Sequence, residues 1–439
     1  MKRLYLIPII ALLVALAIPL TASAQITYNA GFQVQNLDPS NAATIQIVFY
    51  NQDGSTAATV DDTVPAGGSK TYFPLDAVSD GFNGSVVISS DRDIRAIANV
   101  LGNGLAYGAS YGAFTAGATT VYVPLLMKAN SGYNTWFNIQ NTGSSATDVT
   151  VTYSDAVTAS CTNLQPGAAC TLNQATEAHT SGWVGSAIVT AGQPVAVTVM
   201  EVGPTTLFTY DGFTGGSTDV AMPLINANNA GYITGVQIMN LGDITTSVTV
   251  SYTHSLAGTD CAETKTIPAG KSETFALNAF AKTVTGENCT DGAKFVGSAR
   301  ITGNSAGQNL VAIVNQLNIG ANKGAAYEGF DPLTATDSVV MPLIMDRNSN
   351  YWTGFSVANV GSAATTVNCT FSGSITHTES ATLNPGQAMT ALQNGVIASG
   401  YVGSATCTAG AGGKIVGIVN ELNSVLTGDA FLVYDAFNQ

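Results

Sequence analysis

The chain has 439 residues, of which only 10% are charged, and its formal net charge is −14 at pH 7, or −16 without Lys2 and Arg3. A chain this acidic repels nucleic acid and anionic lipid, which excludes both as partners. The sequence is rich in Gly, Thr, Ser, Asn, Ala and Val, a composition typical of extracellular β proteins and rare in helical ones.

The first 24 residues have the pattern of a cleaved signal peptide. Lys2 and Arg3 precede an apolar run that ends in Ala22-Ser23-Ala24, and small residues at this place mark a cleavage site. Beyond residue 24, no apolar stretch approaches the roughly 20 residues of a membrane-spanning helix. We therefore expect a mature chain from Gln25 to Gln439 that is secreted, extracellular or on the cell surface, with no membrane insertion after cleavage.

Four landmarks then recur in the same order along the chain. The first is an aromatic-led strand that ends in Asn, at Asn36, Asn141, Asn240 and Asn359. The second is a turn that begins with Pro, at Pro65, Pro166, Pro268 and Pro385. The third is an aromatic residue two positions before Gly-Ser, at Phe82, Trp183, Phe295 and Tyr401. The fourth is a closing Tyr-x-x-Phe segment, ending at Phe114, Phe213, Phe330 and Phe437.

The spacing of these landmarks predicts the size of the repeated domain. Successive copies lie 105, 99 and 119 residues apart, measured between Phe32, Phe137, Val236 and Phe355. This period is too long for a solenoid and suits a small β-sandwich, and apolar residues inside each copy alternate with polar ones, as in strands. We predict an all-β chain of four tandem immunoglobulin-like antiparallel β-sandwich modules, over residues 25–120, 121–219, 220–338 and 339–439, after a signal peptide of residues 1–24.

The six cysteines favour disulfides, because an exported chain meets an oxidising compartment. Modules 2, 3 and 4 hold two each, which predicts the pairs Cys161–Cys170, Cys261–Cys289 and Cys369–Cys407. The first pair flanks a Pro-Gly turn and is expected to join the two strands of a hairpin. The third pair has inward parity on two strands and is expected to bridge the two sheets of a sandwich.

The sequence offers little that points to catalysis. Two Gly-x-Ser-x-Gly segments surround Ser110 and Ser305, but neither precedes the helical pattern that a hydrolase nucleophile requires. The three histidines, His179, His254 and His377, lie in different modules without a zinc-ligand spacing, and we interpret them as exposed loop residues. We expect no enzyme activity, no catalytic residue, no cofactor and no metal site.

Two repeated features are interpreted as structural. The aromatic residues before Gly-Ser occupy one place in every module, which favours packing over sugar stacking. The strand-ending asparagines share the inward parity of the core, so we expect buried amides that hold the following turn.

These motifs carry a resemblance. They are Asn-x-Gly after the aromatic strand, the Pro-Gly turn, and Gly-Ser-Ala followed by an "AIVN"-like strand at Ile97, Ile313 and Ile418. With these motifs, the chain resembles a loosely defined group of uncharacterised secreted bacterial proteins with tandem immunoglobulin-like β-sandwich repeats. The resemblance implies an extracellular or cell-surface role and transfers no active site.

The first functional hypothesis is a structural or interaction protein, a subunit of an extracellular filament, sheath or surface layer that associates with itself or with other cell-surface proteins. The four modules contain only three Pro-Leu segments, at Pro124, Pro223 and Pro342. If each segment is a strand, one terminal module lacks it and has an open edge, unless residues Gln25 to Asn29 substitute for it. An open edge invites strand addition from a neighbour.

The alternative hypothesis is a carbohydrate-binding protein or adhesin. Asn-rich loops follow the Pro-Leu segments, and their amides and tyrosines would bind glycans. The candidate ligand residues are Asn130, Tyr133, Asn228, Tyr232, Asp346, Asn348 and Tyr351. Asp346 also begins a calcium-loop-like pattern, but Tyr351 and Val357 stand where an EF-hand needs Gly and Glu. An EF-hand is therefore rejected, and a looser oxygen-lined calcium site that uses Asp346 is left as an alternative.

Overall fold

The structure is a computed structural model that describes residues 26–104, 106–277, 289, 292–373, 375–423 and 425–439. The predicted signal peptide lies outside these residues. The described chain is all-β, as predicted, with antiparallel sheets and a single 3-10 turn, η1 (Ile319–Ala321). Among these residues, no helix has the length and apolar character needed to cross a membrane.

Named strands pair only within four stretches of the chain, which we call unit 1 (26–117), unit 2 (118–216), unit 3 (217–335) and unit 4 (336–439). In each unit we call the sheet whose last strand contacts the other units at the centre of the molecule the inner sheet, and the other one the outer sheet. In unit 1, the inner sheet has the order β4-β1-β6-β7 and the outer sheet has the order β3-β2-β5. The strands of unit 1 are β1 (Tyr28–Asn36), β2 (Ala43–Asn51), β3 (Thr56–Val64), β4 (Ser69–Tyr72), β5 (Gly84–Ser90), β6 (Ile94–Gly102) and β7 (Tyr107–Gly112).

Unit 2 has two layers that share one long strand, β13. Its first half pairs with β8 and β10, and its second half pairs with β9 and β14, so the sheet passes from the outer layer into the inner one. The strands of unit 2 are β8 (Ala118–Lys128), β9 (Asn134–Asn141), β10 (Thr147–Tyr153), β11 (Thr158–Leu164), β12 (Ala169–Asn173), β13 (Trp183–Val202) and β14 (Leu207–Asp211).

Units 3 and 4 repeat this plan with separate sheets. In unit 3 the outer sheet is β15-β20-β17-β18 and the inner sheet is β19-β16-β21-β22. In unit 4 the outer sheet is β26-β25-β28-β23-β31 and the inner sheet is β27-β24-β29-β30. The strands of unit 3 are β15 (Asp219–Ala227), β16 (Ile233–Asn240), β17 (Thr246–Ala257), β18 (Cys261–Ile267), β19 (Ser272–Phe275), β20 (Phe295–Gly303), β21 (Leu310–Asn318) and β22 (Lys323–Glu328). Those of unit 4 are β23 (Ser338–Asp346), β24 (Tyr351–Asn359), β25 (Thr365–Phe371), β26 (Thr378–Leu383), β27 (Ala388–Gln393), β28 (Tyr401–Ala409), β29 (Ile415–Asn423), β30 (Phe431–Asp435) and β31 (Phe437–Asn438).

The alternating sequence pattern explains how the sheets form a core. In β10, Val149, Val151 and Tyr153 are buried while the threonines between them are exposed. Period-two burial of this kind places one face of a strand in the core and the other in water. Because the same parity recurs in each unit, the apolar residues collect between paired layers and give a β-sandwich-like core.

A buried asparagine at the end of an inner strand fixes the next turn in every unit, as the sequence predicts. The Asn141 Nδ2 donates to the carbonyls of Ser145 and Leu164, both at 2.8 Å, and its Oδ1 accepts from the Gly143 N–H at 2.9 Å. Its three counterparts make the corresponding bonds and are fully buried, namely Asn36, Asn240 and Asn359.

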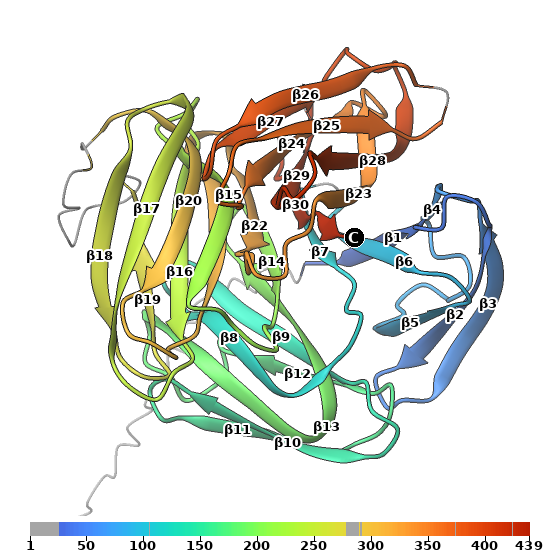
Figure 1. Ribbon diagram of the computed structural model, residues 1–439. Helices are drawn as coiled ribbons and strands as arrows, with labels where there is room; N and C mark the ends of the chain where they lie inside the picture. The colour runs from blue at the N-terminus through green and yellow to red at the C-terminus, as the bar shows by residue number, and fades with distance from the viewer. Residues whose placement is uncertain (1–25, 105, 278–288, 290–291, 374, 424) are drawn as a thin grey trace, which may run out of the picture.

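The last inner strands of the units, β7, β14, β22 and β30, meet at the centre of the molecule (Figure 1). Three of the units also place an isoleucine in the core of a neighbouring unit. Ile313 of unit 3 packs into the core of unit 2, Ile418 of unit 4 into that of unit 3, and Ile97 of unit 1 into that of unit 4. The last contact joins the end of the chain to its beginning, so the units form a closed ring.

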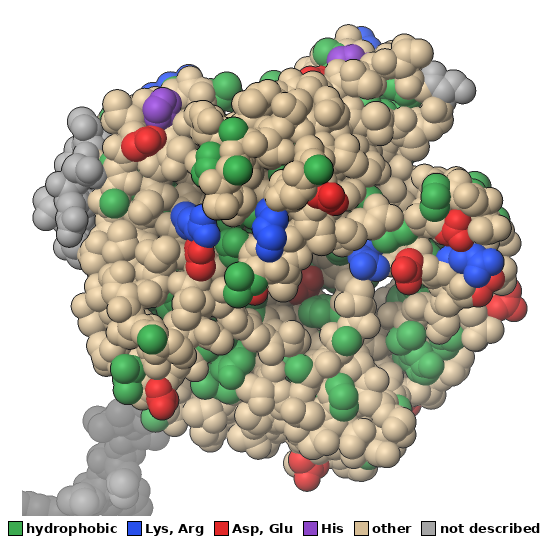
Figure 2. All heavy atoms as spheres, in the orientation of Figure 1, with side chains coloured by type: hydrophobic (Ala, Val, Ile, Leu, Met, Phe, Trp, Pro, Cys, Tyr) green, Lys and Arg blue, Asp and Glu red, His purple; other side chains and the backbone are tan. Residues whose placement is uncertain are grey.

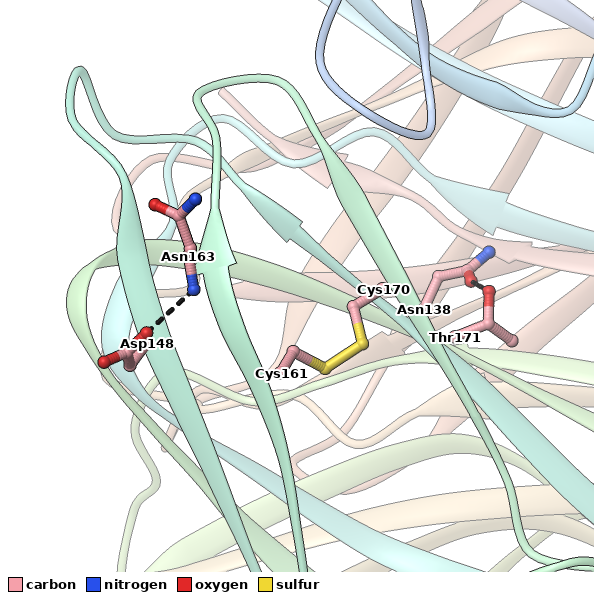
Figure 3. The surroundings of a disulfide bond; sticks show 6 residues. All are labelled: Asn138, Asp148, Cys161, Asn163, Cys170 and Thr171. Atoms are coloured by element: carbon pink, nitrogen blue, oxygen red, sulfur yellow. Dashed lines mark hydrogen bonds between the residues drawn. A yellow bond between two sulfur atoms is a disulfide. The ribbon is translucent and has the colours of Figure 1, made fainter.

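All six cysteines are paired within their own unit, as Cys161–Cys170, Cys261–Cys289 and Cys369–Cys407, which suits an oxidising compartment. Two expectations about their placement were wrong. Cys161 lies on β11 and Cys170 on β12, and these strands pair with different partners, so the bond joins two layers rather than a hairpin (Figure 3). Cys369 lies directly opposite Cys407 on adjacent strands of one sheet, so this bond does not cross the sandwich.

Candidate functional site

The candidate ligand loops are tight turns between the Pro-Leu strands and the aromatic-led strands. Residues 130 and 133 bond to each other through their backbones, and so do the pairs 229–232 and 348–351. Each turn has three residues with positive φ, and they include Gly132, Gly231 and Asn350. The amides are partly used inside the protein, since Asn130 lies 3.7 Å from the Met127 sulfur and Asn228 donates to the carbonyl of Ala293. Asn348 is partly buried.

The tyrosines of these loops pack inward and do not form flat exposed faces. The Tyr133 ring lies 5.9 Å from that of Phe208, and its hydroxyl is 2.7 Å from the Thr206 hydroxyl. The Tyr232 ring of unit 3 contacts that of Phe431 of unit 4 edge to face at 5.4 Å. Tyr351 has a buried hydroxyl. These tyrosines are therefore contacts near the centre of the ring.

Asp346 anchors the loop before β28. Its fully buried carboxylate accepts from the N–H groups of Gly395 and Ile397, both at 2.8 Å, and from Arg347 Nε at 2.7 Å. Burial acts to raise the pKa of Asp346, but these donors outweigh burial and lower it. A carboxylate surrounded by N–H donors does not suit a calcium ion, and no cluster of metal-ligating side chains forms in the described residues.

The interpretation of the histidines as exposed was wrong for His179, whereas His254 is exposed and His377 is partly buried. His179 is buried between Asp155, 2.8 Å from Nδ1, and Gln174, 3.0 Å from Nε2, and its ring stacks on Trp183. His254 and His377 also have acidic partners, Asp260 and Glu379. These partners lie 24, 6 and 2 residues away along the chain, and the positions of the histidines alone did not indicate them. No histidine bonds Ser110, whose hydroxyl donates to Asn99 Oδ1 at 2.6 Å.

Two buried glutamates join neighbouring units near the centre. Asn315 of unit 3 donates to Glu201 of unit 2 at 2.8 Å, and Asn99 of unit 1 donates to Glu421 of unit 4 at 3.1 Å. Burial raises the pKa of each glutamate to about 8, against a smaller lowering by the asparagine. Both carboxyls are therefore protonated in the folded protein near neutral pH.

Asp429 of unit 4 ties the other three units together. Its carboxylate accepts from the N–H of Leu207 in unit 2 at 2.8 Å and from that of Gly324 in unit 3 at 2.9 Å. Its own N–H donates to the carbonyl of Ala106 in unit 1 at 2.7 Å. Burial raises the pKa of Asp429 to about 8. Asp211, Glu328 and Asp435 gather at the other end of the central strands, where burial and mutual repulsion raise the pKa values of both aspartates.

The Pro-Leu segments are outer strands of units 2, 3 and 4. They are β8, β15 and β23, and each pairs with the strand that carries Gly-Ser, which is β13, β20 or β28. The closing tyrosine of the same unit binds the Leu of each segment: the hydroxyls of Tyr210, Tyr327 and Tyr434 donate to the carbonyls of Leu125, Leu224 and Leu343. This bond links the closing segment of each unit to its Pro-Leu segment.

Among the described residues, unit 1 has no corresponding strand. Its Gly-Ser strand, β5, pairs only with β2, and none of the described residues pairs with its other side, which we call the β5 edge (residues 84–90) (Figure 1). Val87 is 39% exposed, and Val86 and Ile88 are only partly buried, whereas their counterparts in unit 2, Ala187 and Val189, are buried. The counterpart of the closing tyrosines, Tyr111, makes no side-chain hydrogen bond to any described residue.

The neighbouring surface of unit 2 is also incompletely covered. β8, β15 and β23 each pack on the inner strands of the following unit in the ring, which for β23 is unit 1. There, Gln33 Nε2 of unit 1 donates to the carbonyl of Pro342 in β23 at 2.5 Å. Unit 2 follows unit 1, and no such strand of unit 1 packs on it in the part of the chain that the structure describes. Thr198 is only partly buried, whereas its counterparts Ile97, Ile313 and Ile418 are buried. The Gln140 Nε2 has no hydrogen-bond partner in the described structure.

No family model and no curated protein sequence matches this chain. Functional assignment therefore rests on the geometry of the molecule itself. On the face shown in Figure 2, acidic and basic side chains are scattered and form no large patch of one sign. Other edge strands, such as β3, β18 and β26, also pair on one side only, but β5 is the one Gly-Ser strand of the described structure that has a single neighbour, since β13, β20 and β28 are paired on both sides.

Proposed function

We propose that the chain is a secreted structural protein of four tandem immunoglobulin-like modules, a subunit of an extracellular filament, sheath or surface layer. The repeated landmarks, the export-type leader and the three disulfides support this proposal. A ring of small polar modules stapled by disulfides suits a protein that must persist outside the cell.

The observation that carries the proposal is the β5 edge. An unpaired strand presents a row of N–H and C=O groups to which another chain can add a strand. Natural proteins usually guard such edges with charge, Pro or a bulge, and β5, with the sequence GSVVISS, has none of these. Assembly then proceeds by strand addition at unit 1, from another copy or from a cell-surface protein.

The test compares Val87→Lys with Leu392→Lys by light scattering and electron microscopy of the exported protein. Val87 and Leu392 are both exposed apolar residues on strands, but Leu392 lies on β27, far along the chain from the β5 edge. We expect Val87→Lys to abolish the assemblies that the wild type and Leu392→Lys form, because only Val87→Lys places a charge on the edge where the partner strand adds. Leu392→Lys places the same charge on a different edge strand, β27. A wild type that stays monomeric at high concentration, or equal assembly of both variants, would overturn the proposal.

The carbohydrate alternative has weaker support. A sugar-stacking site needs exposed aromatic faces, and Tyr133 and Tyr232 use their rings against Phe208 and Phe431. We therefore do not extend the proposal to glycans.

A further inference from the structure

Unit 1 keeps the two elements between which the other units hold their Pro-Leu strand. In units 2, 3 and 4 this strand pairs with the Gly-Ser strand on one side. On its other side it pairs with the closing phenylalanine, in the pairs Tyr122–Phe213, Ala221–Phe330 and Val340–Phe437. Unit 1 has both elements, and the backbone N–H and C=O of Phe114 have no hydrogen-bond partner among the described residues. We call the space between residues 84–90 and Phe114 the β5 slot.

The closing tyrosine of unit 1 has the position of a ligand for this strand. β7 places Tyr111 opposite Ala98, as β14 places Tyr210 opposite Val199. The Tyr210 hydroxyl donates to the Leu125 carbonyl and accepts from the Leu125 N–H at 3.2 Å. Tyr111 is only partly buried and has no side-chain hydrogen bond to a described residue. Its hydroxyl is therefore free to bind the backbone of a leucine in the same way.

The end of the slot also matches unit 2. Gly81 has a φ of 85° and Gly182 a φ of 84°. The Gly182 N–H donates at 2.8 Å to the carbonyl of Lys128, the last residue of β8, whereas the Gly81 N–H has no partner in the described structure. A cavity of about 440 Å³ lies beside Gly81, Phe82 and Asn83. This end of the slot has both a free donor and space for a further residue.

The side of the slot that faces unit 2 is not filled by an isoleucine. At the position where the other units have Ile97, Ile313 and Ile418, unit 2 has Thr198, whose hydroxyl donates to Asp211 Oδ1 at 3.3 Å within the same unit. Figure 2 shows a hollow between unit 1, on the right, and the centre of the molecule, on the side of unit 1 where Figure 1 places β5. A further strand can enter from this side.

The three filled copies define the strand that fits. Two residues, three and one positions before the proline, are apolar and buried in each copy, namely Val121, Val123, Val220, Met222, Val339 and Met341. The ladder shifts register at Pro-Leu in all three, and a bulge of this kind suits a residue that has no N–H. In unit 1 the two apolar residues would lie opposite Ile88 and Val86, which are only partly buried.

We propose that the β5 slot binds a strand of a separate polypeptide with the pattern Val-x-Val/Met-Pro-Leu, antiparallel to β5. The inference rests on the proposed function, because it names the segment that adds at the β5 edge. In the described structure, β8, β15 and β23 are each held in their own unit, so a second copy has none of them free to donate. The partner is a cell-surface protein that presents such a segment unpaired.

The test measures binding of a fluorescent peptide, TTVYVPLLMK, which has the sequence of residues 119–128, to the exported protein. We expect saturation at one peptide per chain, because the other three units already contain this strand. Asp in place of the two inward valines, at peptide positions 121 and 123, should weaken binding more than about tenfold, since it buries charge. Asp at the outward positions 120 and 122 should weaken it far less. Absent binding, or equal binding of the two Asp peptides, would overturn the inference.

Two further measurements locate the peptide. Tyr111→Phe should weaken binding about tenfold, because it removes two hydrogen bonds to the leucine backbone. Tyr107→Phe is the control, since it removes a hydroxyl from the same strand that donates to the Pro204 carbonyl instead. Bound peptide should slow hydrogen exchange in β5 but not in β3, the other edge of the same sheet. Equal affinities of the two variants, or equal slowing in β3 and β5, would contradict binding in the slot.

The outcomes separate this inference from the proposed function. If Val87→Lys abolishes assembly but the peptide does not bind the wild type, the Pro-Leu specificity is rejected and assembly through β5 is kept. If the peptide binds the slot but the wild type never assembles, assembly is rejected and the Pro-Leu slot is kept.

Discussion

At the residue scale, the strand-ending asparagine forms hydrogen bonds to backbone groups that have no backbone partner. Asn141 satisfies two carbonyls and one N–H from the turn that follows β9. A buried amide can do this because it carries both donors and an acceptor. An apolar residue would fill the same volume but leave three polar groups without partners.

We expect Asn141→Ala to lower the free energy of unfolding by about 3 kcal/mol, because each buried group left unsatisfied costs about 1 to 3 kcal/mol. Chemical denaturation measures the change. Asn304→Ala is the control, since Asn304 lies in an exposed turn, and it should change stability by no more than about 0.5 kcal/mol. Equal effects of the two substitutions would show that the amide does not hold the turn.

At the element scale, the disulfides stabilise by closing loops of different length. Cys369 and Cys407 are 38 residues apart, and Cys161 and Cys170 are 9 apart. Units 2 and 3 place Val151, Val189, Val250 and Ile301 at the positions of the longer pair, so valine suits that site.

We expect Cys369→Val/Cys407→Val to cost about 4 kcal/mol and Cys161→Ala/Cys170→Ala to cost about 2.6 kcal/mol, from the loop-closure entropy of each bond. Denaturation of the two variants beside the wild type measures the difference. A larger loss from the shorter loop would mean that local packing, rather than loop closure, sets the stabilisation.

At the scale of the whole molecule, carboxyls that stay protonated connect the units. The pKa values of Glu201 and Glu421 are about 8 in the folded chain and near the ordinary 4.5 when it unfolds. Between these values the folded state holds protons that the unfolded state has released. Its stability is therefore greatest below pH 4.5 for these groups and falls as the pH rises towards 8.

The expected slope is about 1.4 kcal/mol per pH unit for each group. Denaturation midpoints at pH 5 and pH 8 measure it, and the double variant Glu201→Gln/Glu421→Gln should show a shallower fall, because Gln keeps a hydrogen bond and has no proton to lose. The same pH profile in both proteins would contradict the assignment.

A variant of Asp429 tests whether hydrogen bonds at the centre of the ring hold the units together. Asp429→Ala leaves the N–H groups of Leu207 and Gly324 without their acceptor, so we expect a loss of about 3 kcal/mol and faster hydrogen exchange in β14 and β22. Asp53→Ala, in an exposed hairpin, should cost less than about 1 kcal/mol. Unchanged exchange in β14 and β22 would show that other contacts hold the units together.

The sequence alone determined the features that depend on near neighbours or on repetition. Alternating residues such as Val149 and Val151 predicted the strands, and repetition predicted the buried asparagines and the three disulfide pairs. Local spacing carries such information because a strand has period two and a repeated unit must satisfy the same backbone groups each time.

Only the tertiary structure decided what meets at the centre and what stays unpaired. Glu201 meets Asn315 across 114 residues, and Glu421 meets Asn99 across 322, which no local pattern encodes. The sequence also led to the prediction that His179 is on the surface, because its partner Asp155 lies 24 residues away and meets it only in the folded chain. The count of Pro-Leu segments predicted an open edge at one end of the chain, but only sheet pairing placed it at β5, since an edge is defined by the strand that is missing beside it.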